Sequence, residues 1–256
     1  MSESRPAPAR PRPPRPSSDW ALFLDVDGCL LDIAETPDAV VVVAGLRERL
    51  AALSAELGGA LALVSGRSLP VLDTLFAPLR LPAAGLHGLE RRNGEAVFDA
   101  PAPPALLPAL LDEARVLASA HPGTVVEDKG TAIGLHWRQA PDAENAMQAF
   151  ALDALARLPG YRLQHGKQVV ELRPEDGHGG GDKGDAIAAF LREAPFAGRV
   201  PVFAGDDLTD ESGFAVVNTH GGISVLVGDR GGSAASHGLR NPADVHAWLG
   251  VQGVRS

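Results

Sequence analysis

The chain has 256 residues, of which 45% are hydrophobic, a formal net charge of -9 and one cysteine, Cys29. This composition can bury a sizeable core in one large or two modest domains, and its acidity disfavours binding to nucleic acids or to anionic membranes. No apolar stretch approaches the roughly 18 residues that span a bilayer, and the first residues lack the apolar segment of a signal peptide. Since a single cysteine excludes an internal disulfide, we expect a cytoplasmic protein.

Residues 1–18 precede the first apolar run. They contain six prolines and four arginines and almost no residue that would be buried in a core. Such a composition is typical of a disordered segment with polyproline bias. We therefore expect a disordered, dispensable tail, with recognition of its prolines by a partner or contact with lipid as the alternatives.

The apolar run at residues 22–24 predicts a buried parallel strand, and Asp25 and Asp27 follow directly after it. In open α/β sheets the chemistry is located at the carboxyl ends of parallel strands. Period-two geometry directs the two carboxylates to the same side, where neighbouring negative charges need a cation. An acidic turn that merely closes the strand is the alternative, because Asp and Gly are common in turns.

The next segment has the pattern of a βαβ unit with a parallel sheet. Leucines recur at helical spacing over residues 46–57, and residues 60–64 predict a second buried strand that ends at Ser65. Pro70 suits the first turn of the helix that follows. Ser65 is either a functional hydroxyl at the end of this strand or an ordinary cap or turn residue.

The pattern changes over residues 101–174, where a helix and two strands occur twice. The expected elements are helix 104–120, strands 124–127 and 131–138, helix 142–158, a strand at 161–163, a turn around residues 165–166 and a strand at 167–173. Two such αββ units can pair into one antiparallel sheet with helices on a single face. We predict that they form a cap domain inserted into a core domain of residues 19–100 and 175–256.

The core resumes after a glycine-rich return at residues 177–181, where Asp182 is predicted to cap a helix that begins at Lys183. Residues 200–204 predict another buried strand, followed by the acidic cluster at residues 205–211. Acids at the start of a helix are common without any function. A further strand is expected at 223–227 and a closing helix at 242–249. The predicted fold class is α/β, a doubly wound parallel-sheet, Rossmann-like core with an inserted α+β cap domain of two αββ units.

Four ends of predicted core elements thus carry Asp-x-Asp, Ser, Lys and an Asp cluster, in that order. Together they supply a carboxylate nucleophile, an acid/base, a hydroxyl and an ammonium for phosphoryl oxygens, and carboxylates for Mg²⁺. In this respect the sequence resembles the haloacid dehalogenase superfamily of phosphatases. The position of the cap between the Ser and Lys motifs resembles the sugar-phosphatase branch of that superfamily.

Within that branch the chain resembles the trehalose-6-phosphate phosphatase family over essentially everything after the tail. The stretches that look like family signatures are Asp25-Val26-Asp27-Gly28, Ser65-Gly66-Arg67, Gly85-Leu86-His87-Gly88, Val126-Glu127-Asp128-Lys129-Gly130, Glu171-Leu172-Arg173-Pro174, Asp182-Lys183-Gly184 and Gly205-Asp206-Asp207-Leu208-Thr209-Asp210-Glu211. Cys29 is a departure, because family members usually carry Thr there. The glycine-rich run before Lys183 is another.

The resemblance implies Mg²⁺-dependent hydrolysis of trehalose 6-phosphate to trehalose and phosphate through an aspartyl phosphate. Asp25 would attack the phosphorus. Asp27 would protonate the departing sugar oxygen and then deprotonate the attacking water. Ser65 and Lys183 would hold the transferring oxygens.

The same resemblance implies the ligands of the metal and of the sugar. Mg²⁺ would be bound by Asp25, the carbonyl of Asp27 and Asp206, with Asp207 and Asp210 nearby. The implied substrate-binding residues are Arg67, His87, Glu127, Lys129 and Glu171, of which the last three would grip the glucose ring. Closing of the cap would exclude bulk water and deliver these sugar contacts.

Other functions remain compatible with the sequence. Within the enzyme interpretation, the alternative is a phosphatase of another sugar phosphate. A receiver-like phospho-acceptor module uses similar strand-end groups, but the inserted cap and the chain length count against it. A catalytically silent sugar-binding protein is disfavoured because every expected polar position is filled. We expect a small-molecule sugar phosphate as the partner. A monomer is the default expectation for the oligomeric state.

Overall fold

The structure is a computed structural model, and it describes residues 10–36, 39–175 and 181–251. It divides into two compact units. The core unit comprises Met1–Asp32, Val41–Val97 and Asp182–Ser256, and the cap unit comprises Ile33–Val40 and Phe98–Gly181. The cap predicted at residues 101–174 lies within the second unit. Of the predicted glycine-rich return, only Gly181 belongs to the described residues.

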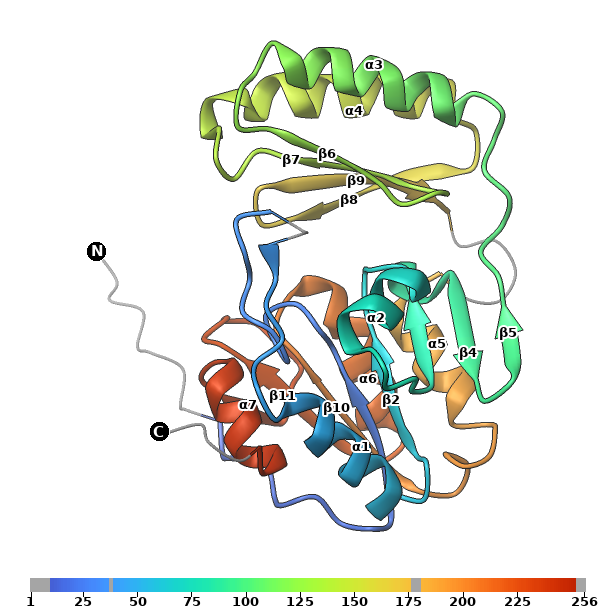
Figure 1. Cartoon of the computed structure of the whole chain (residues 1–256), viewed down its shortest axis with the longest axis vertical. Coiled ribbons are helices and arrows are strands. Elements are labelled where there is room, and N and C mark those ends of the chain that lie inside the picture. The colour runs from blue at the N-terminus through green and yellow to red at the C-terminus, as the bar shows by residue number, and fades with distance from the viewer. Residues whose placement is uncertain (1–9, 37–38, 176–180, 252–256) are drawn as a thin grey trace. The chain divides into compact units, whose positions relative to one another are not determined.

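An eight-stranded sheet forms the centre of the core unit (Figure 1), in the order β12-β11-β10-β1-β2-β3-β4-β5. Its strands are β1 Trp20–Leu24, β2 Leu61–Val64, β3 Ala83–Gly85, β4 Glu90–Asn93, β5 Ala96–Phe98, β10 Val200–Gly205, β11 Ile223–Val227 and β12 His237–Leu239. Neighbouring strands are parallel from β12 to β3, and β4 is antiparallel to β3. The predicted parallel α/β core is therefore confirmed.

The strands that the sequence predicts best are those that are buried along their whole length. Every residue of β1 and β2 is buried, as expected of parallel strands that are covered on both faces. Strand β1 lies between β10 and β2, so that its carboxyl end is at the middle of the sheet. The helices of this unit are α1 Leu46–Glu56, α2 Leu69–Phe76, α5 Lys183–Phe190, α6 Glu211–Thr219 and α7 Pro242–Leu249.

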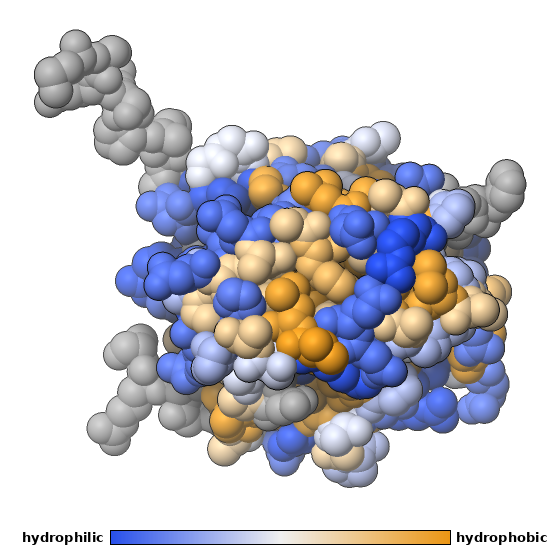
Figure 2. Space-filling model, turned by 90° about the horizontal axis from the view of Figure 1, so that it is seen from above, coloured by the Kyte–Doolittle hydropathy of each residue, from blue (hydrophilic) through white to orange (hydrophobic). Residues whose placement is uncertain are grey.

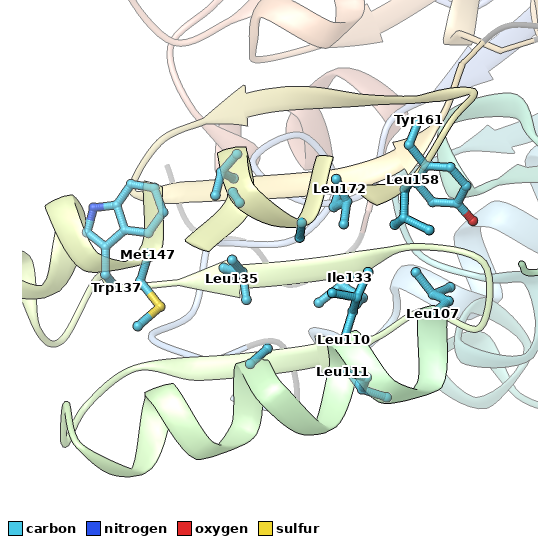
Figure 3. Packing of buried hydrophobic residues seen from close by; sticks show 14 of the residues in the cluster. Leu107, Leu110, Leu111, Ile133, Leu135, Trp137, Met147, Leu158, Tyr161 and Leu172 are labelled. Atoms are coloured by element: carbon cyan, nitrogen blue, oxygen red, sulfur yellow. The ribbon is translucent and has the colours of Figure 1, made fainter. Parts of the chain in front are cut away.

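The cap unit is a four-stranded antiparallel sheet with two helices on one face (Figure 1). Its elements are α3 Leu107–Ser119, β6 Val125–Asp128, β7 Ile133–His136, α4 Glu144–Arg157, β8 Tyr161–Gly166 and β9 Val169–Pro174, with the sheet order β6-β7-β9-β8. Figure 3 shows Ile133 and Leu135 of β7 packed with Leu110 of α3 and Met147 of α4. Because side chains alternate along a strand, the remaining positions of each strand lie on the face without these helices.

Several short strands and one turn were not predicted. Strands β3, β4, β5 and β12 have only three or four residues, which is too short for a clear apolar or alternating pattern to mark them. The turn predicted around residues 165–166 is wrong, because β8 continues through Gly166 and the chain turns at residues 167–168 instead. Gln168 adopts a left-handed backbone conformation there, with φ of 60°. Residues other than glycine seldom adopt this conformation, so the residue type at position 168 does not mark the turn.

The predicted disordered tail needs a correction for residues 10–18, which the structure describes in contact with the rest of the core unit. Nε of Arg10 donates a hydrogen bond to the carbonyl of Ala235 at 2.9 Å, and the indole N–H of Trp248 donates one to the carbonyl of Pro14 at 2.7 Å. The carbonyl of Pro11 accepts a hydrogen bond from Gly238 N at 3.0 Å. A proline-rich backbone has few N–H groups but keeps all its carbonyls, and those of Pro11 and Pro14 accept hydrogen bonds here.

The outer surface of the cap helices is mixed in character. Val116 of α3 and Leu152 of α4 are 71% and 59% exposed. Figure 2 shows apolar and hydrophilic surface interspersed on the face seen from above. Among the described residues, none of the helices is both long and apolar enough to cross a membrane.

Candidate active site

Two aspartates with different surroundings follow the carboxyl end of β1. The side chain of Asp25 is 5% exposed, whereas that of Asp27 is 37% exposed. The left-handed turn at Gly28, with φ of 81°, follows. A Cβ atom at Gly28 would lie 2.1 Å from Oδ2 of Asp206, so only glycine lets this turn approach the acidic loop after β10.

Lys183 connects Asp25 to the acidic loop after β10. It is the first residue of α5, whose N-cap is Asp182, with Oδ1 accepting a hydrogen bond from Asp185 N at 2.9 Å. Its buried Nζ donates to Oδ1 of Asp25 and to Oδ1 of Asp210, each at 2.7 Å. Burial opposes its charge, but Asp210 and Asp25 outweigh burial and raise the pKa of Lys183 well above its usual value. The ammonium is therefore charged at neutral pH.

The loop after β10 is held by its own carboxylates. Oδ2 of Asp210 accepts hydrogen bonds from the backbone N–H groups of Asp206 and Asp207, at 2.8 and 2.9 Å. Oδ1 of Asp207 accepts from the N–H and hydroxyl of Thr209, at 2.7 and 2.6 Å. These contacts form a capping box at the short helix Leu208–Asp210. They fix the loop so that the carboxylates of Asp206 and Asp210 are presented together.

Three of the predicted metal ligands meet in one group. One carboxylate oxygen from each of Asp25, Asp206 and Asp210 lies within 4.8 Å of the others. Burial first, and then the neighbouring carboxylates, raise the pKa of Asp206 to about 7, and burial likewise raises the pKa of Asp25 and of Asp210. Each of these carboxylates makes the negative charge of its neighbours less favourable, and a bound cation would relieve that repulsion. Carboxylate oxygens are the hard donors that a divalent cation such as Mg²⁺ prefers. The residues present therefore fit the expected metal.

The carboxylates of Asp27 and Asp207 lie outside this group. Asp207 is engaged in the capping box, and burial is outweighed by Lys183 and Thr209 so that the pKa of Asp207 lies below its ordinary value. The carboxylate of Asp27 is bound by Arg67 instead. That the carbonyl of Asp27 is a metal ligand stays a prediction.

Ser65 and Arg67 follow β2, beside β1 in the sheet. The side chain of Ser65 is buried, and its Oγ accepts a hydrogen bond from Arg67 N at 3.1 Å. The guanidinium of Arg67 donates from Nε and Nη2 to the two carboxylate oxygens of Asp27, at 2.7 and 2.8 Å. The residue predicted to bind substrate thus contacts the predicted general acid.

His87 is held against the Ser65–Arg67 segment by an unusual turn. Leu86 and His87 both adopt left-handed conformations, with φ of 50° and 57°. A Cβ atom at Gly66 would lie 2.5 Å from Nε2 of His87, so the glycine makes room for the imidazole. Residues other than glycine adopt such conformations at a cost, and strained backbone of this kind is concentrated at functional sites.

The predicted sugar-binding residues form a second cluster, within the cap unit. Nζ of Lys129 lies 2.6 Å from Oε2 of Glu171 and 3.9 Å from Oε2 of Glu127. Nε2 of His136 lies 2.9 Å from the same Glu127 oxygen. Burial disfavours the charge of Glu127, but His136 and Lys129 outweigh it, so that the pKa of Glu127 is lowered. The three predicted residues therefore lie together, on the face of the sheet opposite Ile133 and Leu135.

Two residues of these clusters were missed from the sequence. His136 has the same parity on β7 as Gly134, the cross-strand neighbour of both Glu127 and Glu171, so strand alternation could have identified it. Arg230 donates a hydrogen bond from Nη2 to the carbonyl of Asp207 at 3.0 Å and pairs with Glu211. It lies in a loop without periodicity, where no sequence signal marks it.

The chain is similar to known proteins over most of its length. A family model described as trehalose-phosphatase matches residues 23–245. The trehalose-6-phosphate phosphatase of Escherichia coli (strain K12) is 46% identical over 238 residues, which are 92% of this chain and 87% of that protein. A probable trehalose-phosphate phosphatase of Sinorhizobium fredii (strain NBRC 101917 / NGR234) is 48% identical over 211 residues, 82% of this chain and 78% of that protein.

A solved structure shows the same fold. The C-terminal domain of the C. albicans trehalose-6-phosphate phosphatase has a TM-score of 0.78 at 21% identity, with coverage of 95% of this chain and 98% of that chain. The family model and the two relatives each extend over most of the sequence, including both units. The chain therefore belongs to the trehalose-phosphatase family and is a phosphoric monoester hydrolase.

Proposed function

We propose that the protein hydrolyses trehalose 6-phosphate to trehalose and inorganic phosphate, with Mg²⁺ as its cofactor. The observation that carries this proposal is the buried group at the carboxyl ends of β1 and β10, in which Lys183 bonds Asp25 and Asp210 and Asp206 completes a set of three carboxylates. The names of the relatives support the choice of substrate.

Asp25, Asp206 and Asp210 are the residues that would hold Mg²⁺. When bound, the ion would offset the repulsion between the anionic nucleophile and the anionic phosphate. The nearby Lys183 ammonium adds a fixed positive charge that neither titrates at neutral pH nor reorients, because it is buried and bonded to two carboxylates. The site thereby concentrates positive charge where a phosphate would bind.

Asp25 is the nucleophile in this proposal. Its carboxylate oxygen forms a bond to phosphorus as the bond from phosphorus to the sugar oxygen breaks, giving an aspartyl phosphate and free trehalose. Water then attacks the phosphorus, releases phosphate and regenerates the carboxylate. Lys183 and the hydroxyl of Ser65 bind the phosphoryl oxygens as charge redistributes.

Asp27 is the general acid and base. It lies two residues after Asp25, and Arg67 orients its carboxylate. In the first step it gives a proton to the departing sugar oxygen, and in the second step it takes one from the attacking water. The proton balance over the two steps is closed, because the proton lost in the first step is recovered in the second.

Glu127, Lys129 and Glu171 supply recognition of the sugar. Carboxylates accept hydrogen bonds from sugar hydroxyls and the ammonium donates them. The contacts between Lys129 and both carboxylates hold the three groups close together before substrate binds. A different arrangement of hydroxyls would leave some of these charged groups unpaired, which is a strong basis for discrimination. The cytoplasmic location and monomeric state expected from the sequence stay predictions.

Release of phosphate from a panel of sugar phosphates, with and without Mg²⁺, tests the proposed function. We expect the highest kcat/KM for trehalose 6-phosphate and no turnover after chelation with EDTA. A higher kcat/KM for another sugar phosphate would contradict the substrate assignment while leaving the chemistry intact. A single stoichiometric transfer without continued release would indicate the phospho-acceptor alternative.

A further inference from the structure

His136 is placed on the sugar-recognition face of the cap sheet by the register of β7. The strand pairs Glu127 with Gly134 on one side and Gly134 with Glu171 on the other. His136 follows Gly134 by two residues and therefore lies on the same face, whereas Leu135 between them packs into the hydrophobic core (Figure 3). Its side chain, like that of Glu127, is 23% exposed.

The hydrogen bond between His136 and Glu127 has a defined direction. A carboxylate in its ionised form only accepts hydrogen bonds, and Glu127 is ionised at neutral pH. Nε2 of His136, 2.9 Å from Oε2 of Glu127, must then carry the hydrogen. The tautomer of His136 is therefore set by its partner.

The two carboxylates of the cluster have different close partners. Lys129 Nζ is 2.6 Å from Glu171 but 3.9 Å from Glu127, beyond hydrogen-bond distance. The close donor to Glu127 is thus the imidazole of His136 and not the ammonium. Gly134 has no side chain between the two groups, and a Cβ atom there would lie 3.1 Å from Nε2 of His136 and 3.2 Å from Oε2 of Glu127.

We propose that His136 is a positioning residue for sugar recognition, which holds the carboxylate of Glu127 in the orientation that accepts hydrogen bonds from sugar hydroxyls. This inference rests on the proposed function of the Glu127, Lys129 and Glu171 cluster. His136 acts through Glu127 and does not touch the substrate. A partly exposed pair of this kind contributes little to folding, so its effect is expected in recognition.

A double-mutant cycle tests the inference. The variants are His136→Leu, Glu127→Ala and the combination, and the measured quantity is the ratio of kcat/KM for trehalose 6-phosphate to kcat/KM for p-nitrophenyl phosphate. We expect His136→Leu to lower this ratio about 10-fold, as on loss of one charge-assisted hydrogen bond. In the Glu127→Ala background the same substitution should change the ratio by less than about 2-fold, because the group that His136 positions is absent.

Two further variants distinguish positioning from a structural role. His136→Gln keeps an N–H donor on a side chain of similar reach and should retain most of the ratio. His165→Leu is the matched control. His165 is exposed on β8 and lies on the same face as Leu163, which packs against the hydrophobic cluster, and hence on the helix-bearing face rather than on the sugar-recognition face. That control should leave both substrates unchanged.

Three outcomes would overturn the inference. An additive effect of His136→Leu in the Glu127→Ala background would show that the imidazole contacts substrate itself. If His136→Leu and His136→Gln both lowered kcat/KM equally for the two substrates, the role of His136 would be structural. If neither variant lowered kcat/KM for trehalose 6-phosphate, His136 would have no role in recognition. An error in the proposed substrate can be distinguished from an error in this inference. If the wild-type protein prefers another sugar phosphate, the same cycle is run on that compound and the expected non-additivity is unchanged.

Discussion

The guanidinium of Arg67 donates hydrogen bonds to both carboxylate oxygens of Asp27, at 2.7 and 2.8 Å, although the two residues are 40 positions apart in the sequence. The Arg67 side chain is only 10% exposed. Two parallel hydrogen bonds from a planar guanidinium fix the orientation of a carboxylate as well as its position. Asp27 therefore has a defined orientation beside Asp25 before any substrate binds.

Replacing Arg67 should impair the reaction through Asp27. We expect Arg67→Ala to lower kcat at least about 10-fold for trehalose 6-phosphate, because a misplaced general acid loses part of its roughly 10²–10⁴-fold contribution. A series of aryl phosphates with decreasing leaving-group pKa provides the measurement. The defect should shrink as the leaving group departs more readily without a proton, as it should in Asp27→Asn. Arg80→Ala, at an arginine whose side chain is 63% exposed, is the control. A defect of equal size across the series would instead assign Arg67 to phosphate binding.

Asp25→Asn should abolish turnover while the fold is kept. Asparagine is nearly isosteric but cannot form the acyl phosphate. Since Asp25 is one of three carboxylates that repel one another, the substitution should not lower the melting temperature. Phosphate release and thermal unfolding are the two measurements, with the exposed Asp19→Asn as the control. Release within about 10-fold of the wild-type rate would exclude the covalent mechanism.

Lys183→Met should destabilise the metal-free protein strongly. Lys183 is 3% exposed and bonded to Asp25 and Asp210, so its removal leaves buried carboxylates without their counter-charge. Loss of one partner of a buried ion pair costs about 3–5 kcal/mol. Denaturant unfolding in EDTA measures the free energy of unfolding, and Lys167→Met, at an exposed turn position, should change it by less than about 0.5 kcal/mol. A similarly small change for Lys183→Met would show that the cluster is not held by this ammonium.

Mg²⁺ should stabilise the protein as well as activate it. A ligand that binds only the folded state raises the melting temperature with its concentration. We expect such a rise for the wild type and a rise only at much higher Mg²⁺ for Asp206→Ala, since one hard oxygen ligand is lost. Asp112→Ala, at an exposed position of α3 with a side chain 76% exposed, should behave as the wild type. Full phosphate release in excess EDTA would refute the metal requirement.

The sequence predicts the parts of the core whose burial is uniform. The runs that became β1, β2 and β10 are apolar because both faces of a parallel strand are covered, and the functional groups follow directly where those runs end. Strand β4 was not predicted, because its residues Glu90–Asn93 are mostly charged. The structure shows why this is possible. Arg91 pairs with Glu193 at 2.7 Å and Arg92 with Asp73 at 2.6 Å, partners that no local pattern reveals.

The candidate site, like the fold, was predicted only in part from the sequence. That Asp25, Lys183 and the acidic loop belong together follows from their places at the ends of core elements. Which groups are in contact does not follow. Arg67 is a long side chain that could reach either a substrate or Asp27, and Asp207 could ligate a metal or cap the next helix. These choices depend on distances of a few ångströms, which sequence periodicity does not encode.

Glu127, Lys129 and Glu171 of the cap unit should be needed for the sugar substrate only. Glu127→Ala, Lys129→Ala and Glu171→Ala should each lower kcat/KM for trehalose 6-phosphate at least about 10-fold, the effect of losing one charge-assisted hydrogen bond. Lys129→Ala should have the largest effect, because its ammonium lies 2.6 Å from Glu171 and 3.9 Å from Glu127 and its removal leaves two carboxylates to repel each other. The side chains of Lys129 and Glu171 are only 11% and 6% exposed, so this repulsion is poorly screened by water. Kinetics with trehalose 6-phosphate and with p-nitrophenyl phosphate provide the measurement, and the loss should be confined to the sugar substrate. Parallel loss with both substrates would assign these residues to the structure of the cap, and unchanged kinetics with both would mean that the sugar is recognised elsewhere.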